Sequence, residues 1–318
     1  MLTDHLPRVT IAHLPTPLEP SGAVGVKRDD QTGLATGGNK TRKLEFLVAD
    51  ALRHEANTLI TCGAAQSNHA RQTAAAAAKF GLDRILVLRG QRPTEVTGNL
   101  LLDHLLAADI VWAGVEPLDE RMEKVAEQLR AEGQRPYVVS YGGSNAVGAT
   151  GYAAAIEELL NQAQNHDLAF DHIVLASSSG GTQAGLEVGA RALGYQGRIL
   201  GISVEPKAAV LRETLAGLAS KVADHLDLEL AFEPADFSVN DEYLGGGYGV
   251  VSDLERDAIR TLARTESLLL DPVYTGRAFG GLLDMICRGK FQSHERVLFW
   301  HTGGTAGLFD TRRELLAT

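Results

Sequence analysis

Cysteine is scarce in this chain, which has only Cys62 and Cys287 among its 318 residues. Two cysteines cannot form a disulfide framework in a chain of this length, and such scarcity is typical of proteins from a reducing compartment. The sequence also lacks an apolar run of about 20 residues, which a membrane-spanning helix requires. Its first residues have neither the basic nor the apolar region of an export signal. We therefore expect a soluble protein of the cytoplasm.

Positive charge is in short supply, with 30 lysines and arginines against 40 acidic residues and a net charge of −10. This balance argues against nucleic acid or an anionic membrane as a partner. The histidines are scattered and lack the paired spacing of a zinc site, so we expect no metal. A Gly-x-Ser-x-Gly elbow is missing as well, which argues against a serine hydrolase.

Glycine, in contrast, is abundant, with 34 residues against 10 prolines. Many of the glycines fall in a repeated pattern of apolar strand, Gly/Ser/Asn loop and alanine-rich helix, at residues 58–79, 137–161 and 172–193. Continuous apolar runs at 84–88, 198–204 and 297–300 suit strands that helices cover on both faces. The pattern predicts an α/β fold with a mostly parallel, doubly wound sheet.

The loops of this pattern are where a ligand is expected. In open parallel sheets, ligands bind beyond the carboxyl ends of the strands. We therefore expect the loops that begin at Cys62, Ser140, Ala176 and His301 to face a common crevice.

A lysine stands between a glycine loop and an amphipathic helix, in Thr36-Gly37-Gly38-Asn39-Lys40-Thr41-Arg42-Lys43. The segment nearly matches a nucleotide-binding P-loop, but Asn39 separates the last glycine from Lys40, and a polar segment precedes the loop instead of an apolar strand. Cations are unfavourable at a helix N-terminus, where the dipole favours anions. A phosphate, or a cofactor bound to Lys40 as an imine, would offset the charge of Lys40 and Lys43.

A second loop, at residues 176–185, contains Ser177-Ser178-Ser179-Gly180-Gly181-Thr182 between a strand and a helix. Backbone N–H groups and hydroxyls at such a helix start bind phosphate well. An ordinary helix cap is the alternative. The glycine spacing does not match a dinucleotide fingerprint, although Glu205 after the next strand keeps that possibility open.

Other polar and aromatic residues stand at similar junctions. Ser67 and Asn68 open a helix, either as caps or as groups that meet a substrate carboxylate and a phenolate-like oxygen. Tyr248 and Tyr274 lie on glycine-rich or turn segments, where a tyrosine acts as an acid or base if its pKa falls below ~10. Thr302 follows the strand at 297–300 and could face a ring nitrogen as a neutral partner.

Taken in order, these segments resemble one enzyme family. They are Gly37-Gly38-Asn39-Lys40-Thr41-Arg42-Lys43, Gln66-Ser67-Asn68-His69, the Ser/Gly/Thr loop, Gly247-Tyr248-Gly249, Asp271-Pro272-Val273-Tyr274-Thr275-Gly276 and His301-Thr302-Gly303-Gly304. The order resembles the branch of fold-type II pyridoxal-phosphate enzymes that contains 1-aminocyclopropane-1-carboxylate (ACC) deaminase and D-cysteine desulfhydrase. The likeness runs from Pro15 to Phe309.

The resemblance implies a fold similar to that of the tryptophan synthase β subunit, with two doubly wound open sheets that have helices on both faces. A large cofactor domain would comprise residues 1–47 and 156–318, with a smaller α/β domain, 48–155, inserted. It also implies a homodimer. The cofactor would be pyridoxal 5′-phosphate.

The resemblance also implies a role for each site residue. Lys40 would form the Schiff base and move the α-proton, and Ser67, Tyr248 and Tyr274 would surround the small amino-acid substrate. Asn68 would bond the ring oxygen of the cofactor. The groups that would hold the phosphate are Lys43, Ser178, Ser179, Gly180, Gly181 and Thr182, and the groups near the pyridine nitrogen would be Thr275 and Thr302.

Two departures from the family pattern bear on the substrate. ACC deaminases carry glutamate where this chain has Thr275, and a neutral partner makes the cofactor a weaker electron sink, suited to a good β-leaving group. Ser178 stands where desulfhydrases usually have glycine, which leaves the details of the phosphate loop open. The region around Pro15 and the segment 303–309 also resemble L-cysteate sulfo-lyase.

These features predict a pyridoxal-phosphate-dependent carbon–sulfur lyase that performs β-elimination. D-cysteine, giving pyruvate, sulfide and ammonia, is the first choice of substrate. L-cysteate, with sulfite as the leaving group, is the second, and ACC is disfavoured. A non-catalytic protein that binds a nucleotide or pyridoxal phosphate is the alternative from another class.

Overall fold

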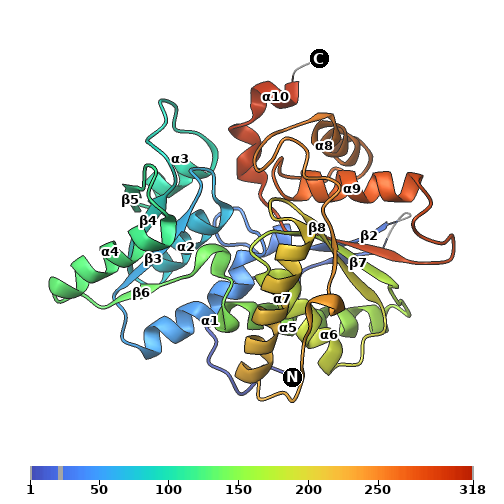
Figure 1. Cartoon of the computed structure of the whole chain (residues 1–318), viewed down its shortest axis with the longest axis horizontal. Helices are drawn as coiled ribbons and strands as arrows, with labels where there is room; N and C mark the ends of the chain where they lie inside the picture. Colours follow the sequence, from blue (N-terminus) through green and yellow to red (C-terminus); the bar gives the residue numbers. More distant parts are fainter. Residues whose placement is uncertain (1, 21–23, 317–318) are drawn as a thin grey trace.

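The computed structural model describes residues 2–20 and 24–316. Its strands form two sheets that lie in two lobes side by side (Figure 1). The six-stranded sheet has the order β1 (Leu18–Glu19), β2 (Val24–Arg28), β10 (Val297–His301), β7 (His172–Ser177), β8 (Arg198–Ser203) and β9 (Ser238–Asn240). The four-stranded sheet has the order β5 (Asp109–Trp112), β4 (Asp83–Leu88), β3 (Thr58–Gly63) and β6 (Pro136–Val138). Neighbouring strands are parallel except for β1 and β2.

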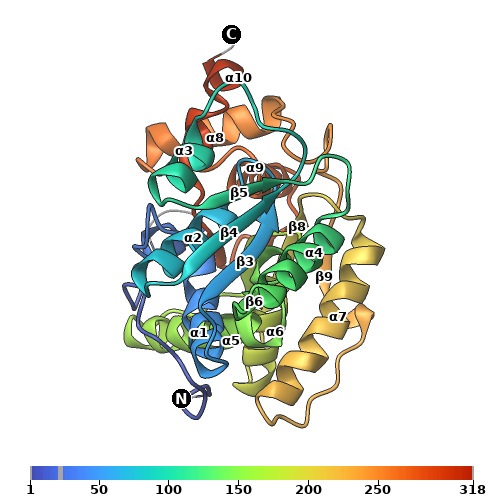
Figure 2. The same cartoon turned by 90° about the vertical axis from the view of Figure 1, so that its left-hand side faces the viewer.

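Helices cover both sheets, as the alternating sequence pattern predicts. They are α1 (Lys40–Arg53), α2 (Asn68–Lys79), α3 (Gly98–Leu105), α4 (Leu118–Ala131), α5 (Ala146–Asn165), α6 (Gly181–Ala192), α7 (Ala208–His225), α8 (Asp253–Thr265), α9 (Thr275–Cys287) and α10 (Arg312–Leu316). Figure 2 shows α4 and the four-stranded sheet on the side that faces the viewer. In the part of the chain that the structure describes, no helix has the length and apolar character that crossing a membrane requires.

The predicted strands are confirmed within one or two residues, and the α/β fold with them. The predicted domain boundaries fall inside α1 and α5, and α1 packs against both α5 and α2. The two lobes would therefore share these helices. We retain the division into a large domain and an inserted domain as a proposal, which the separate sheets support.

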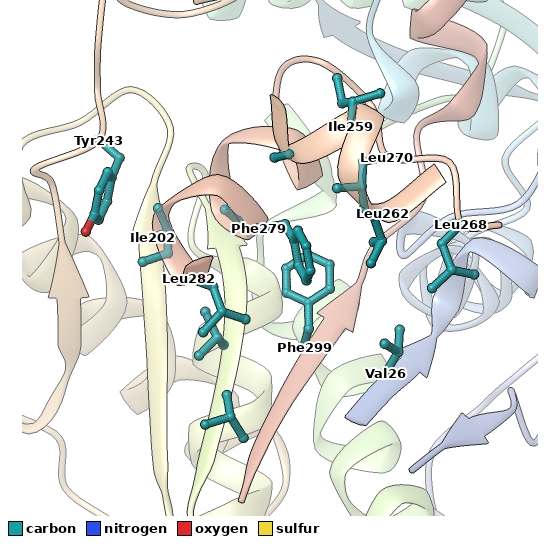
Figure 3. Packing of buried hydrophobic residues seen from close by; sticks show 14 of the residues in the cluster. Val26, Ile202, Tyr243, Ile259, Leu262, Leu268, Leu270, Phe279, Leu282 and Phe299 are labelled. Carbon is teal, nitrogen blue, oxygen red and sulfur yellow. The ribbon is translucent and has the colours of Figure 1, made fainter. Parts of the chain in front are cut away.

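The core beside the six-stranded sheet holds the end of β10 in place (Figure 3). Every residue of β10 is buried, as its continuous apolar run predicts. Phe299 meets Phe279 of α9 edge to face, with ring centroids 5.1 Å apart and an interplanar angle of 69°. Ile259 and Leu262 of α8 belong to the same cluster. This packing positions the loop that follows His301.

The polar segment before the lysine loop differs from the expectation, because Val24–Arg28 form strand β2 within the six-stranded sheet. Lys27 is buried there, and its Nζ atom donates to Glu158 Oε1 at 2.5 Å. Asp29 is also buried and accepts from Arg42 and from Trp300 Nε1. Charged residues tolerate such burial when they are paired and hydrogen-bonded. The same contacts fix the start of α1.

Candidate active site

The predicted crevice exists, and loops from both lobes line it. Loops that follow β3, β6, β7 and β10, together with the start of α1, contribute its walls. Of the predicted residues, Lys40, Ser67, Asn68, Ser178, Ser179, Gly180, Thr182, Tyr274 and Thr302 line the cavity. Lys43, Gly181, Tyr248 and Thr275 do not line it.

Lys40 is the first residue of α1 and reaches into the cavity. Burial lowers the pKa of its ammonium to about 8, while the negative charge of Asp271 acts in the opposite direction. A lysine with a lowered pKa holds more neutral amine near pH 7, and the neutral amine is the form that attacks a carbonyl. The position and the pKa of Lys40 therefore suit covalent attachment of an aldehyde cofactor.

Asn68 and Ser67 stand at the start of α2. The hydroxyl of Ser67 accepts from Ala70 N at 3.1 Å, so this residue caps the helix as well as lining the cavity. Asn68 Oδ1 accepts from Asn99 Nδ2 at 2.9 Å. The Asn68 amide nitrogen faces Gly304, because a Cβ atom at Gly304 would lie 2.8 Å from Asn68 Nδ2.

The loop after β7 makes an open helix start. Gly180, at φ +83°, precedes α6, and the first turn of α6 has neither a side-chain cap nor an acidic residue. Ser144, from the loop after β6, supports this turn: its hydroxyl accepts from Gly181 N at 3.1 Å and lies 2.8 Å from Ser179 Oγ. Free N–H groups and hydroxyls at a helix start suit a phosphate.

Lys43 stands behind this loop, one turn of α1 after Lys40. Its buried ammonium donates to Gly142 O at 3.1 Å and to Ser144 Oγ at 3.2 Å, both uncharged acceptors. Burial, with the nearby charge of Lys40, holds the pKa of Lys43 well below its usual value. A Cβ atom at Gly181 would lie 2.6 Å from Lys43 Nζ, so glycine permits the close approach. An anionic phosphate beside this ammonium would favour its charged form. The residues present therefore fit pyridoxal phosphate.

Asn39 joins the lysine loop to two other walls of the cavity. Its side-chain Nδ2 atom donates to Thr182 Oγ1 at 2.9 Å, and its backbone N–H donates to Thr302 O at 3.0 Å. Lys40 Nζ also lies 3.3 Å from Asn39 Oδ1. Asn39 thus sets the spacing between Lys40, the loop after β7 and the loop after β10.

The two tyrosines form a pair of which Tyr274 lines the cavity. Their hydroxyls are 2.7 Å apart and their rings meet edge to face. Burial raises the pKa of Tyr248, and burial together with Tyr248 raises that of Tyr274 well above its usual value. Acid–base use of a tyrosine was expected to need a lowered pKa, and the structure shows the opposite shift. Both hydroxyls are therefore neutral near pH 7 and exchange hydrogen bonds as donors and acceptors.

Thr275 is buried at the start of α9 and bonds to an acid in its own segment. Its hydroxyl donates to Asp271 Oδ1 at 2.8 Å and accepts from Asp271 N at 2.7 Å. The carboxylate of Asp271 also accepts from Thr275 N at 2.6 Å, and burial raises its pKa. The neutral side chain at position 275 thus has an acidic neighbour that is close enough to influence Lys40.

Sequence reasoning missed several residues that organise the site. Asp271 lies within a motif that drew attention only to its tyrosine and threonine, although an acid before a helix start is a common cap. Ser144 stands in a loop that was expected to face the crevice, but its role beside the phosphate loop went unnoticed. Asn99 had no local signal, because its partner Asn68 is 31 positions away in the chain.

The fold and the site together define a class of enzyme that holds an aldehyde cofactor on a lysine. The family model described as pyridoxal-phosphate dependent enzyme matches residues 9–303. The chain belongs to this family. Among the residues that the structure describes, no group of three or more histidine, cysteine, aspartate or glutamate side chains could hold a metal ion.

Two proteins with sequences similar to this chain have the same name. The chain is 42% identical over 317 residues to D-cysteine desulfhydrase from Klebsiella pneumoniae (strain 342), covering 95% of each protein. It is 42% identical over 318 residues to D-cysteine desulfhydrase from Salmonella paratyphi A, again covering 95% of each. A solved structure described as an ACC deaminase homologue is 39% identical, with a TM-score of 0.91 over 99% of this chain and 97% of that one.

Proposed function

We propose that this enzyme removes sulfide from D-cysteine by β-elimination, giving pyruvate, hydrogen sulfide and ammonia with the uptake of one water. The observation that carries the proposal is the placement of Lys40, whose pKa is lowered, at a cavity that is also lined by a phosphate-type loop and by Tyr274, to which Tyr248 is hydrogen-bonded. The names of the relatives that are 42% identical over 95% of the chain support the same substrate.

The residues of the chain would divide the work as follows. Pyridoxal phosphate, when bound, supplies an electron sink that weakens the bonds at the α-carbon of the amino acid. Lys40 would hold the cofactor, and its amine, once released, would take the α-proton. Ser67, at the start of α2, would donate to the substrate carboxylate. Tyr274 and Tyr248, as a neutral hydrogen-bonded pair, would orient the thiol and donate hydrogen bonds to the sulfur as sulfide leaves.

The remaining residues would hold the cofactor. Asn68 would donate to its ring oxygen, and Thr302 would face its pyridine nitrogen. The phosphate would bind to Lys43 and to the loop Ser178, Ser179, Gly180, Gly181 and Thr182. Thr275 would act through Asp271, because its hydroxyl is bonded to that residue.

Pyruvate release from purified enzyme tests the proposal. D-cysteine, L-cysteine, L-cysteate and ACC are compared at equal concentration, and we expect D-cysteine to give the highest kcat/KM. Lys40→Ala should abolish both activity and the visible absorption of the bound cofactor. Lys79→Ala, at an exposed position at the end of α2, is the matched control and should behave as wild type. Turnover of ACC without turnover of either cysteine would contradict the proposal.

We also propose that the enzyme is a homodimer, as its family resemblance implies. Leu101 and Leu105 of α3 are 45% and 73% exposed, and Phe309 beside α10 is 66% exposed. These side chains lie near an apolar groove between α3 and the 305–309 turn, on the side where α3 and α10 appear together in Figure 2. Sedimentation of wild type and of Leu105→Glu tests the idea. A wild-type monomer at micromolar concentration would refute it.

A further inference from the structure

A series of side-chain hydrogen bonds joins Asn68 to Asn99 and Arg71, neither of which lines the cavity. Asn99 Nδ2, on α3, donates to Asn68 Oδ1 at 2.9 Å. Arg71, one turn after Asn68 on α2, donates from Nε to Asn99 Oδ1 at 3.0 Å. Arg71 and Asn99 are both fully buried, so water does not compete for these bonds.

The hydrogen bonds from Arg71 through Asn99 to Asn68 can run in only one direction. An asparagine amide can usually turn over, since its oxygen and nitrogen have nearly the same shape. A guanidinium, however, only donates hydrogen bonds. Asn99 must therefore point its oxygen at Arg71 and its nitrogen at Asn68. Asn68 must in turn point its oxygen at Asn99, which directs its own N–H group toward Gly304 and the cavity.

Further hydrogen bonds hold Asn99 and Arg71 in place. Asn99 Nδ2 also donates to Gln66 O at 3.0 Å, and Asn99 N donates to Gln66 Oε1 at 2.8 Å. The bond from Nδ2 agrees with the direction that Arg71 imposes, and the backbone bond holds Asn99 beside Gln66. Arg71 also donates to Ala35 O and to Gly37 O, in the loop that precedes Lys40. One guanidinium thus connects the lysine loop to Asn68.

We propose that Arg71 and Asn99 are positioning residues that keep the Asn68 amide turned with its N–H toward the ring oxygen of the cofactor. This inference rests on the proposed role of Asn68. A ring oxygen that carries negative charge is stabilised by a donor and destabilised by a carbonyl oxygen. The direction of a buried hydrogen-bond chain would therefore set the charge state of the cofactor at this oxygen.

Asn99→Asp tests the direction with almost no change of shape. The carboxylate still accepts from Arg71, but it cannot donate, so Asn68 must turn its nitrogen toward position 99 and its oxygen toward the cavity. In the purified holoenzyme, we expect the ratio of visible to near-ultraviolet cofactor absorption to fall at least threefold. Cofactor affinity, measured by dilution and fluorescence, should fall at least tenfold. Asn161→Asp, on the exposed face of α5, adds the same charge and should leave both values unchanged.

Two further variants separate the possible outcomes. Asn68→Ala should alter the spectrum at least as strongly as Asn99→Asp; a wild-type spectrum for Asn68→Ala would refute the proposed role of Asn68 itself. If Asn68→Ala is altered and Asn99→Asp is not, the positioning role is refuted alone. If circular dichroism shows that Asn99→Asp does not fold, Asn99→Ala tests the positioning role instead. That variant lets the amide turn freely, so a fall of about twofold in the absorption ratio is expected, and no fall overturns the inference.

Discussion

Gly181→Ala should damage the phosphate side of the site, although alanine is normally the better residue in a helix. Gly181 is the first residue of α6, and its side-chain direction points at two neighbours. A Cβ atom there would lie 2.5 Å from Ser144 Oγ, 2.6 Å from Lys43 Nζ and 2.9 Å from Ser144 Cα. The lysine end is flexible, but the Ser144 backbone is not. The loop after β6 must therefore move away from α6.

The size of the effect follows from the hydrogen bonds that Ser144 makes. Its hydroxyl is bonded to Gly181 N, Ser179 Oγ and Lys43 Nζ. Each such bond contributes ~1 kcal/mol to folding, so loss of the three would cost about 3 kcal/mol. The gain from replacing glycine within a helix is at most ~1 kcal/mol. We expect a net loss of about 2 kcal/mol in unfolding free energy. Displacement of the Ser144 loop from the start of α6 should also weaken cofactor binding by at least tenfold. A loss of ~1.4 kcal/mol in binding free energy corresponds to a factor of ten.

Gly217→Ala is the matched control, because it makes the same change where space is open. Gly217 is an exposed residue inside α7, and a Cβ atom there would meet no atom within 4 Å. This variant should gain ~0.8–1 kcal/mol of stability and bind the cofactor as wild type does. Urea unfolding gives the stability, and titration of the apoenzyme followed by visible absorption gives the affinity. The reasoning is refuted if Gly181→Ala binds pyridoxal phosphate as tightly as Gly217→Ala.

Three further measurements probe buried groups elsewhere. Burial raises the pKa of Asp103 to about 7, above its unfolded value of 3.8, so this carboxyl destabilises the fold progressively as the pH rises from 4 to 7. Asp103→Asn should remove that loss, by up to ~1.4 kcal/mol per pH unit in urea unfolding; equal pH dependence in both proteins would contradict this. Covalent attachment of the cofactor to Lys40 should speed up as the pH rises through about 8, and Asp271→Asn should lower the midpoint, since its charge raises the pKa of the lysine. If stopped-flow absorption gives the same pH midpoint of the attachment rate for Asp271→Asn and wild type, Asp271 does not influence the pKa of Lys40. A thiol reagent should label exposed Cys287 in the native enzyme and spare Cys62, which is buried and whose pKa burial raises to about 12. Mass spectrometry of the peptides measures the labelling, and equal labelling of both cysteines would contradict this expectation.

The strands and the position of the cavity could be predicted because their signals are local. Continuous apolar runs indicated β4, β8 and β10, since a strand covered on both faces needs no polar side. The end of each strand then located a loop at the same edge of its sheet. Strand β2 escaped because it carries the charged residues Lys27 and Arg28. The Lys27 ammonium can be buried because it donates to Thr16 O and to two residues of α5, Glu158 and Gln162, that are more than 130 positions away.

The finer arrangement of the site depends on side-chain contacts that the sequence motifs alone did not reveal. The neutral residue Thr275 was expected beside the cofactor, but its hydroxyl is bonded to Asp271, four positions earlier. Asn99 was unremarkable in the sequence, yet it determines which way Asn68 can point. Asp271 could have been recognised as a helix cap from its place four positions before Thr275, whereas only the fold brings Asn99 to Asn68.

The three cations at the start of α1 show how far the electrostatic argument from sequence extends. A helix N-terminus disfavours positive charge, so the presence of Lys40, Arg42 and Lys43 there predicted a bound anion that offsets their charge. The fold itself supplies anions for Arg42, which is bonded to the buried carboxylate of Asp29 and to Glu158. Lys40 has the charge of Asp271 nearby. Among the described residues, Lys43 has only a carbonyl and a hydroxyl as hydrogen-bond partners, and no carboxylate is among the groups that shift its pKa. Lys43 is therefore the cation that a phosphate would neutralise. The lowered pKa of Lys40 leaves its neutral amine available to react with the carbonyl carbon of the cofactor.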